Sequence, residues 1–187
     1  MVKQSKKRRT APAKRAPRKG SPFLLKAADM AKLQEKGAHP WNPNSELIGV
    51  RMGAALGLKR TGVSFVRVPV GKESFVPHAH ACEEEWVYVL YGQGVAWIDG
   101  AEHEIGPGDF MAFPTPSVAH HLRNSGYEDL VYLMGGEHRE VEIADFPTLG
   151  RRMVRVGADV TIYDRAAGQP FGMAPRAPAK AKRKTKR

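Results

Sequence analysis

The chain has 187 residues, enough for one globular domain with appendages, and its formal net charge is +11. Its single cysteine, Cys82, excludes an intrachain disulfide and fits a reducing compartment, so we expect a cytoplasmic location. No apolar run has membrane-spanning length and no secretory segment is recognisable, so we expect no association with a membrane.

Basic residues are concentrated at the two ends of the chain. Residues 1–20 contain nine of the 30 Lys and Arg residues and residues 172–187 contain seven, with no acidic residue in either segment. The part between them therefore holds 14 basic and 19 acidic residues, a net charge of −5. Both ends lack large apolar residues, so we expect disordered basic tails over residues 1–20 and 166–187. Such tails either contact nucleic acid nonspecifically or only keep the chain ends solvated.

The pattern between the tails changes from linker to short strands. Residues 21–46 predict a linker and a short helix that stops before Lys36-Gly37. Residues 47–165 are short apolar runs broken by Gly, Pro, Asn and Asp, which is typical of an all-β sandwich or barrel. The predicted strands are residues 63–70, 86–91, 94–98, 102–105, 110–113, 120–123, 130–134, 153–156 and 160–163. Asp99-Gly100 predicts a two-residue hairpin turn.

Two histidines separated by one residue, His78 and His80, precede a run of three glutamates that ends at Glu85. Residues i and i+2 of a strand face the same side, so the two imidazoles converge and a carboxylate just downstream can join them. Neutral imidazole and carboxylate are ligands for divalent metal ions. The alternative is that these side chains only decorate a solvated face.

This segment resembles the first motif of the cupin superfamily, whose members are small antiparallel barrels of the jelly-roll type. The match is His78-x-His80, four residues, Glu85, six residues, Gly92. The leading glycine of the motif, Gly71, lies six residues before His78 instead of five. Glu84 fits a shorter spacing, but only Glu85 leaves six residues to the glycine. Glu83 and Glu84 are then surface residues or neighbours of the ligands.

A second segment, residues 106–124, resembles the second cupin motif. Gly108, five residues, Pro114 matches it, and so does His120, three residues, Asn124. Pro116 replaces the second glycine of the motif, and one extra residue precedes the histidine. The spacing to Asn124 favours His120, but the adjacent His121 stays open as the third imidazole.

The resemblance implies an all-β jelly-roll (cupin) barrel with a divalent transition metal, which is Mn, Fe, Co, Ni, Cu or Zn. The implied metal ligands are His78, His80, Glu85 and His120. Asn124 and Tyr88 are candidates for orienting the histidines. Cys82 lies close enough in sequence to reach the metal, although a lone cysteine is usually a small packed hydrophobe. No residue can be named as catalytic.

Several functions are compatible with such a site, because one fold hosts many chemistries. We expect a small oxygen-bearing ligand or substrate: a carboxylate, an enol or a sugar-like molecule. If the protein is an enzyme, the family implies a metal-dependent oxygenase, isomerase or decarboxylase. The alternatives are a noncatalytic small-molecule sensor held on nucleic acid by its basic tails and a structural barrel with a vestigial site. The resemblance also implies a homodimer, with residues 130–136 and 151–163 as candidate contacts.

Overall fold

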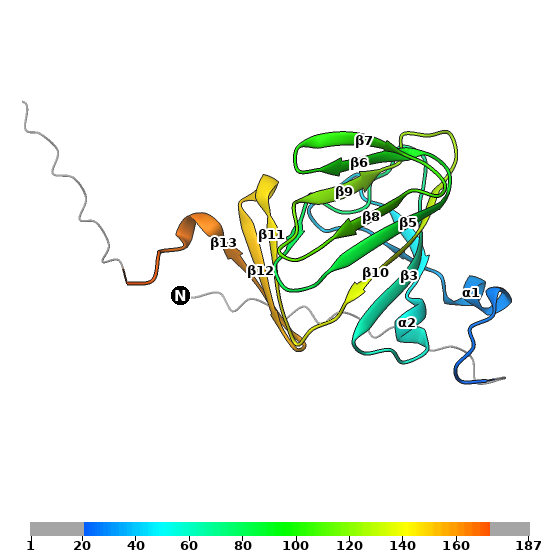
Figure 1. Ribbon diagram of the computed structural model, residues 1–187, viewed down its shortest axis with the longest axis horizontal. Coiled ribbons are helices and arrows are strands. Elements are labelled where there is room, and N and C mark those ends of the chain that lie inside the picture. Colours follow the sequence, from blue (N-terminus) through cyan, green and yellow to red (C-terminus); the bar gives the residue numbers. More distant parts are fainter. Residues whose placement is uncertain (1–20, 173–187) are drawn as a thin grey trace, which may run out of the picture.

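Strands make up most of residues 21–172, the part of the chain that the computed structural model describes (Figure 1). The helices are α1 (Ala27–Leu33) and α2 (Met52–Ala55), and two 3-10 turns follow at Pro147–Leu149 and Arg165–Ala167. The strands are β1 (Glu35–Gly37), β2 (Leu47–Val50), β3 (Thr61–Val68), β4 (Ala79–His80), β5 (Glu85–Tyr91), β6 (Gly94–Ile98), β7 (Ala101–Ile105), β8 (Phe110–Phe113), β9 (His120–Arg123), β10 (Leu130–Glu137), β11 (Val141–Phe146), β12 (Arg151–Val156) and β13 (Asp159–Asp164). No helix in this part of the chain could cross a membrane.

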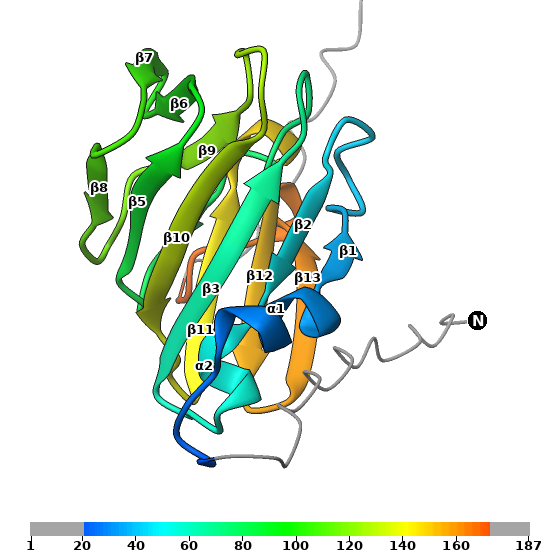
Figure 2. The ribbon, with the colours of Figure 1, turned by 90° about the vertical axis from the view of Figure 1, so that its right-hand side faces the viewer.

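The strands form two facing layers. One layer is a six-stranded antiparallel sheet in the order β1-β2-β3-β10-β5-β8, seen from its outer side in Figure 2. The other contains the sheets β13-β12-β11-β4 and β7-β6-β9. A pair of backbone hydrogen bonds between His78 and His120, at 3.2 and 2.9 Å, links these two sheets. Every pairing between these strands is antiparallel, which confirms the predicted all-β jelly-roll architecture.

The main hydrophobic core lies between the two layers. Val68, Val89, Leu130 and Tyr132 are almost fully buried, and they come from strands of the six-stranded sheet. The opposite layer contributes Ala96, Leu122 and their neighbours. Burying each large aliphatic side chain stabilises the fold by about 1.5–3 kcal/mol. The core therefore holds the two layers in a fixed relation, on which any site between them depends.

Turns and short elements differ in how well the sequence predicted them. Asp99 and Gly100 both have positive φ angles, of 48° and 89°, and connect β6 to β7, which confirms the hairpin. The predicted short helix before Lys36-Gly37 is confirmed, but Gly37 does not cap it. The helix ends at Leu33, and Gly37 lies in β1 opposite Leu47, because the extended chain there pairs with β2.

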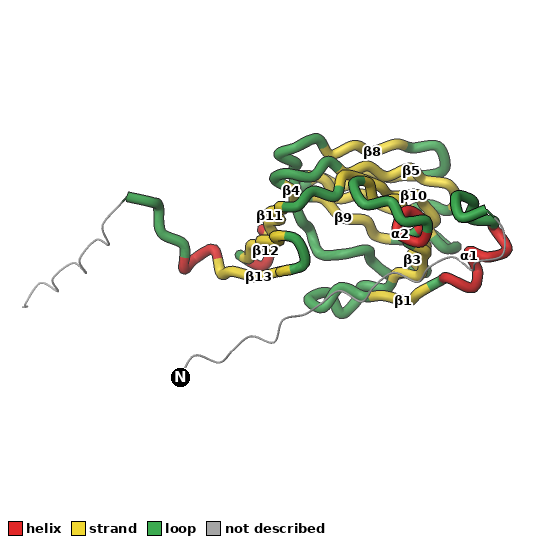
Figure 3. Tube along the Cα trace, turned by 90° about the horizontal axis from the view of Figure 1, so that it is seen from below, coloured by secondary structure: helices red, strands yellow, loops and turns green. Residues whose placement is uncertain are grey.

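Some elements were not predicted at all. Strands β2 and β11 and helix α2 fall in stretches where the apolar pattern is short or mixed. β11 matters most, because it places its residues beside β4 (Figure 3). The predicted basic tails lie outside the described residues, apart from residues 166–172.

Candidate metal centre

The four residues that the two motifs predicted come from four separate places in the barrel and meet at one point. His78 lies just before β4, His80 ends β4, Glu85 begins β5 and His120 begins β9. The Nε2 atoms of His120, His80 and His78 lie 3.0, 3.2 and 3.8 Å from Oε2 of Glu85. One potential ligand atom from each of the four residues lies within 4.8 Å of all the others. The cluster is therefore one compact site that joins both layers of the barrel.

The imidazole rings are held by their other nitrogen atoms. Nδ1 of His78 hydrogen-bonds the carbonyl of Val76 at 2.9 Å, and Nδ1 of His120 hydrogen-bonds that of Val118 at the same distance. A carbonyl oxygen only accepts, so each Nδ1 carries a proton. In the neutral ring Nε2 is then the nitrogen left free for a metal ion, and in the charged ring Nε2 donates to Glu85. These two rings are thus fixed in the tautomer that suits metal binding through Nε2.

Phe113 and Ser117 fix the position of the site further. The ring of Phe113 stacks on that of His120, with centroids 3.6 Å apart and planes 5° apart. Phe113 also lies directly opposite Glu85 in the pairing of β8 with β5. The backbone N–H of His80 donates to Oγ of Ser117 at 2.7 Å, which ties β4 to the loop that precedes β9.

Electrostatics keep the carboxylate ionised. Burial alone would raise the pKa of Glu85, but hydrogen bonds from His120, His78 and His80 hold this pKa well below its usual range. Burial lowers the pKa of His80, but hydrogen bonding and charge interaction with Glu85, and then the nearby charge of Glu142, raise it above its ordinary value overall. The ionised carboxylate of Glu85 therefore favours a positive charge beside it.

The donor set fits a divalent metal ion. In their neutral form, His78 and His120 point Nε2 lone pairs at one carboxylate oxygen, and such acceptor atoms repel one another unless a cation or protons lie between them. Protonating all three imidazoles would place three positive charges in contact, whereas a single ion satisfies the same atoms. A His₃Glu set suits first-row transition metals and leaves coordination positions open on a five- or six-coordinate ion.

His121, the rival third imidazole, faces away from the cluster. Its ring lies 6.0 Å from that of Trp97. His120, Leu122 and Asn124 are all buried, as strand alternation predicted for that side of β9. His120 is thus the imidazole that joins the site.

The two candidates for orienting the histidines do not do so. The side-chain amide of Asn124 donates to the carbonyls of Val68 and Glu128, which secures a turn away from the cluster. Tyr88 points outwards, because in β5 it alternates with the buried Val87 and Val89. Both expectations were wrong, because His78 and His120 find their acceptors in the backbone and His80 faces Glu142.

The residues between the two halves of the first motif have other partners. Glu84 is exposed, and Glu83 forms an ion pair with Arg155 and accepts a hydrogen bond from the backbone N–H of Arg139. Cys82 is partly buried and belongs to neither group of potential metal ligands among residues 21–172.

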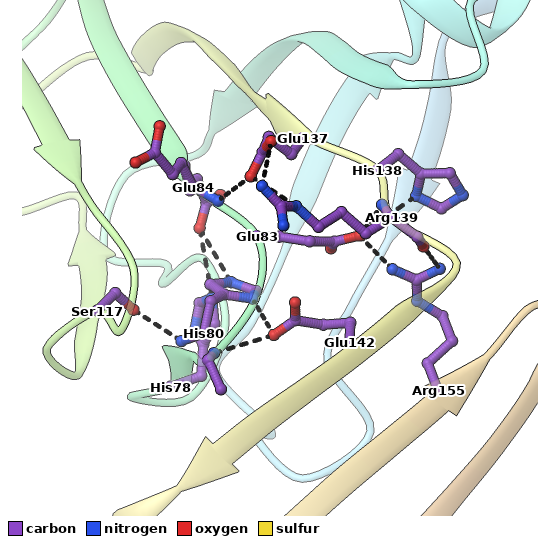
Figure 4. Close-up of polar contacts among 12 residues, drawn as sticks. His78, His80, Glu83, Glu84, Ser117, Glu137, His138, Arg139, Glu142 and Arg155 are labelled. Atoms are coloured by element: carbon purple, nitrogen blue, oxygen red, sulfur yellow. Dashed lines mark hydrogen bonds and ion pairs between the residues drawn. The ribbon is translucent and has the colours of Figure 1, made fainter.

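Sequence reasoning missed one acidic residue at the site. Glu142 on β11 is buried, and its Oε1 lies 3.4 Å from Nδ1 of His80 (Figure 4). The only signal was a charged residue within a predicted β region, and its neighbours Val141 and Ile143 suggested the opposite face. Their side of β11 is the more exposed one, because Glu142, Ala144 and Phe146 face inwards.

A small pocket beside the cluster shares part of its wall with a larger one. A pocket of about 150 Å³ is lined by His80 and Glu85, with Glu83, Glu84 and Glu137 also on its wall. A second pocket of about 380 Å³ has a mainly apolar lining. Ser64 and Met134 line both, so the space beside His80 and Glu85 adjoins a more apolar one.

Comparison with known proteins agrees with this geometry. A family described as "Cupin domain" matches residues 64–136, which run from β3 to β10 and include all four clustered residues. A solved structure from Acidithiobacillus ferrooxidans, provisionally named a sugar phosphate isomerase, is similar with a TM-score of 0.77 and 32% sequence identity. That similarity covers 80% of this chain and 97% of the other.

Two curated proteins match shorter segments. Quercetin 2,3-dioxygenase of Bacillus subtilis is 36% identical over 59 residues, which is 32% of this chain and 18% of that protein. An uncharacterized protein of Methanocaldococcus jannaschii is 32% identical over 82 residues, which is 42% of this chain and 64% of that protein. The chain thus spans less than two thirds of either curated relative.

Proposed function

Because this chain belongs to the cupin superfamily, we propose that it holds a divalent transition-metal ion with His78, His80, Glu85 and His120 and binds or converts a small oxygen-bearing molecule there. The observation that carries the proposal is the convergence of three imidazole Nε2 atoms on one carboxylate oxygen of Glu85. Two of those imidazoles have their Nδ1 atoms committed to backbone carbonyls, so in the neutral rings the Nε2 lone pairs face the same point.

When bound, the ion would polarise or chelate an oxygen-bearing group of the ligand. The protein's own part is to hold the ligand atoms and to shape the space beside them. Phe113 and the two backbone carbonyls keep the rings in place. The apolar wall around Met134 and Val66 excludes water from one side of the ligand space.

The lining of the pockets supports a molecule that combines oxygen atoms with an apolar part. Oxygen atoms would lie beside His80 and Glu85, and the apolar part would lie beyond Met134. Enols and small carboxylates meet this description, and sugar phosphates enter the first test set because of the name that the A. ferrooxidans relative bears.

The direct test is metal analysis of freshly purified protein, followed by titration of the metal-free protein with Mn²⁺, Fe²⁺, Co²⁺, Ni²⁺, Cu²⁺ and Zn²⁺. We expect one ion per chain, lost in His78→Ala and in His120→Ala. His103→Ala, at an exposed position of β7, is the matched control and keeps the ion. Turnover or thermal shift with flavonol, dicarboxylate and sugar phosphate panels then defines the ligand class. Equal metal content in all four proteins would refute the proposed site.

The sensing alternative depends on the basic tails, which lie outside the described residues. It gains support if DNA binding is salt-sensitive and lost on tail deletion while no substrate in the panel turns over. Turnover that is abolished by His78→Ala supports an enzyme instead.

We also propose a homodimer through the outer face of the six-stranded sheet. Tyr88 and Phe110 lie directly opposite each other there, with 39% and 62% of their surface exposed, and Leu133 is the next partner of Tyr88. Exposed aromatic residues on one sheet face are typical of a protein interface. Light scattering should give twice the chain mass for the wild type and the single mass for Phe110→Glu.

A further inference from the structure

Glu142 is a buried carboxylate with few partners. Only 1% of its side chain is exposed. Its Oε1 accepts a hydrogen bond from the backbone N–H of Ala81 at 3.2 Å and lies 3.4 Å from Nδ1 of His80. Its Oε2 has no hydrogen-bond partner among the described residues. A buried carboxylate with one oxygen atom unpaired is costly, so its position calls for an explanation.

His80 is the histidine that lacks a carbonyl on Nδ1. The corresponding atoms of His78 and His120 hydrogen-bond backbone carbonyls, whereas Nδ1 of His80 is buried and is not in hydrogen-bond geometry with any described residue. The acceptor that faces it is the carboxylate of Glu142 (Figure 4). A carboxylate supplies what a carbonyl supplies, an acceptor for the N–H, and adds a full negative charge.

We propose that Glu142 is a positioning residue that orients His80 for metal binding and balances the charge of the ion, an inference that rests on the proposed metal site. A carboxylate behind a metal-bound imidazole fixes the ring and makes it a stronger donor. With a divalent ion present, the charges of Glu85 and Glu142 together neutralise it. Without the ion, Glu142 is a buried charge with an incomplete set of partners.

A second cation between His80, Glu83 and Glu142 is the competing explanation, because potential ligand atoms of these three residues also lie within 4.8 Å of one another. Glu83 is already neutralised, however. The guanidinium of Arg155 pairs with it, the backbone N–H of Arg139 donates to it, and Arg155 and Glu83 are both largely buried. The positive charge for this group therefore comes from Arg155, which favours the positioning role of Glu142.

The test compares Glu142→Gln, Glu142→Leu and the control Glu140→Gln, at an exposed position in the loop before β11. Zn²⁺ and Co²⁺ affinities are measured by chelator competition on the full-length metal-free proteins. We expect affinity to fall about 10-fold for Glu142→Gln and up to about 100-fold for Glu142→Leu, with Glu140→Gln unchanged. The visible spectrum of the Co²⁺-loaded Glu142→Gln protein should also shift, which a purely structural role would not cause.

Thermal melts distinguish a loss of metal positioning from a loss of fold stability in the Glu142 variants. The metal-free Glu142→Gln protein should melt at or above the wild-type temperature, because a buried charge is removed, while its stabilisation by Zn²⁺ should shrink. An equal fall in the metal-free and Zn²⁺-loaded melting temperatures, or an unchanged Zn²⁺ affinity, would overturn the inference. So would two Zn²⁺ per wild-type chain with one lost in Glu142→Gln. If instead the wild type binds no more metal than His78→Ala, the proposed metal site itself fails.

Discussion

The stacked ring of Phe113 should contribute to metal affinity as well as to stability. This residue is 3% exposed, stacks on His120 and is the strand partner of Glu85, so it adjoins two of the four proposed ligands. Replacing Phe113 with Leu removes about three carbon atoms, which at roughly 0.8 kcal/mol each costs about 2 kcal/mol. For a chain of this size that loss lowers the melting temperature by roughly 4–8 °C.

Loss of the stack between Phe113 and His120 should also lower metal affinity, in addition to its effect on stability. An aromatic stack is worth about 0.5–1.5 kcal/mol, so freeing His120 should weaken Zn²⁺ affinity roughly 2- to 12-fold. Met111→Ala is the matched control, because it removes buried surface two residues along the same strand, on the same inward face. Chelator competition and thermal melts are run on both variants. If Phe113→Leu melts earlier but binds Zn²⁺ within twofold of wild type, the stack does not orient His120.

Three further predictions concern backbone approach and pH. A Cβ at Gly136 would collide with the carbonyl oxygen of Glu84, so Gly136→Ala should lower stability by about 1–3 kcal/mol and displace the start of β5, whereas the facing Gly62→Ala has room and should be nearly neutral in thermal melts. Protons compete with the metal for imidazole nitrogen, so the ion should leave between about pH 7 and 5, and metal retained after dialysis at pH 5 would contradict the site. Hydrogen bonds from Arg152, opposed by burial, lower the pKa of Asp145. Its contribution to stability should therefore be present above about pH 4 and vanish as pH falls further, so that urea melts of wild type and Asp145→Asn converge in acid.

The His₃Glu cluster could be predicted because its information is local. The spacing of His78, His80 and Glu85 is compact, and the distance from His120 to Asn124 separates it from His121. Side chains two residues apart share a face of a strand, so alternation predicts that His78 and His80 face the same side. These rules need no knowledge of which strands pair.

The residues that support the cluster depend on pairings that no local pattern specifies. Phe113 is positioned by the register of β8 on β5, and Ser117 by a loop that turns back to His80. Val76 and Val118 act through their carbonyl groups, which any residue type would supply. A sequence pattern therefore cannot reveal them, because the relevant atom is not part of the side chain.

Glu142 illustrates the limit most clearly, since it lies 61 residues beyond Ala81, whose N–H it accepts. In the run from Val141 to Phe146, hydrophobicity places Val141 and Ile143 on the buried face, but the register of β11 on β4 puts Ala144 opposite His80 and turns Glu142 inwards. Shifting the register of a strand by one residue moves every side chain to the opposite face of the sheet. An acidic residue would be expelled from such a position unless something in the barrel stabilised it. The inward orientation of Glu142 is thus a physical argument, independent of the two motifs, for positive charge at the centre of the barrel.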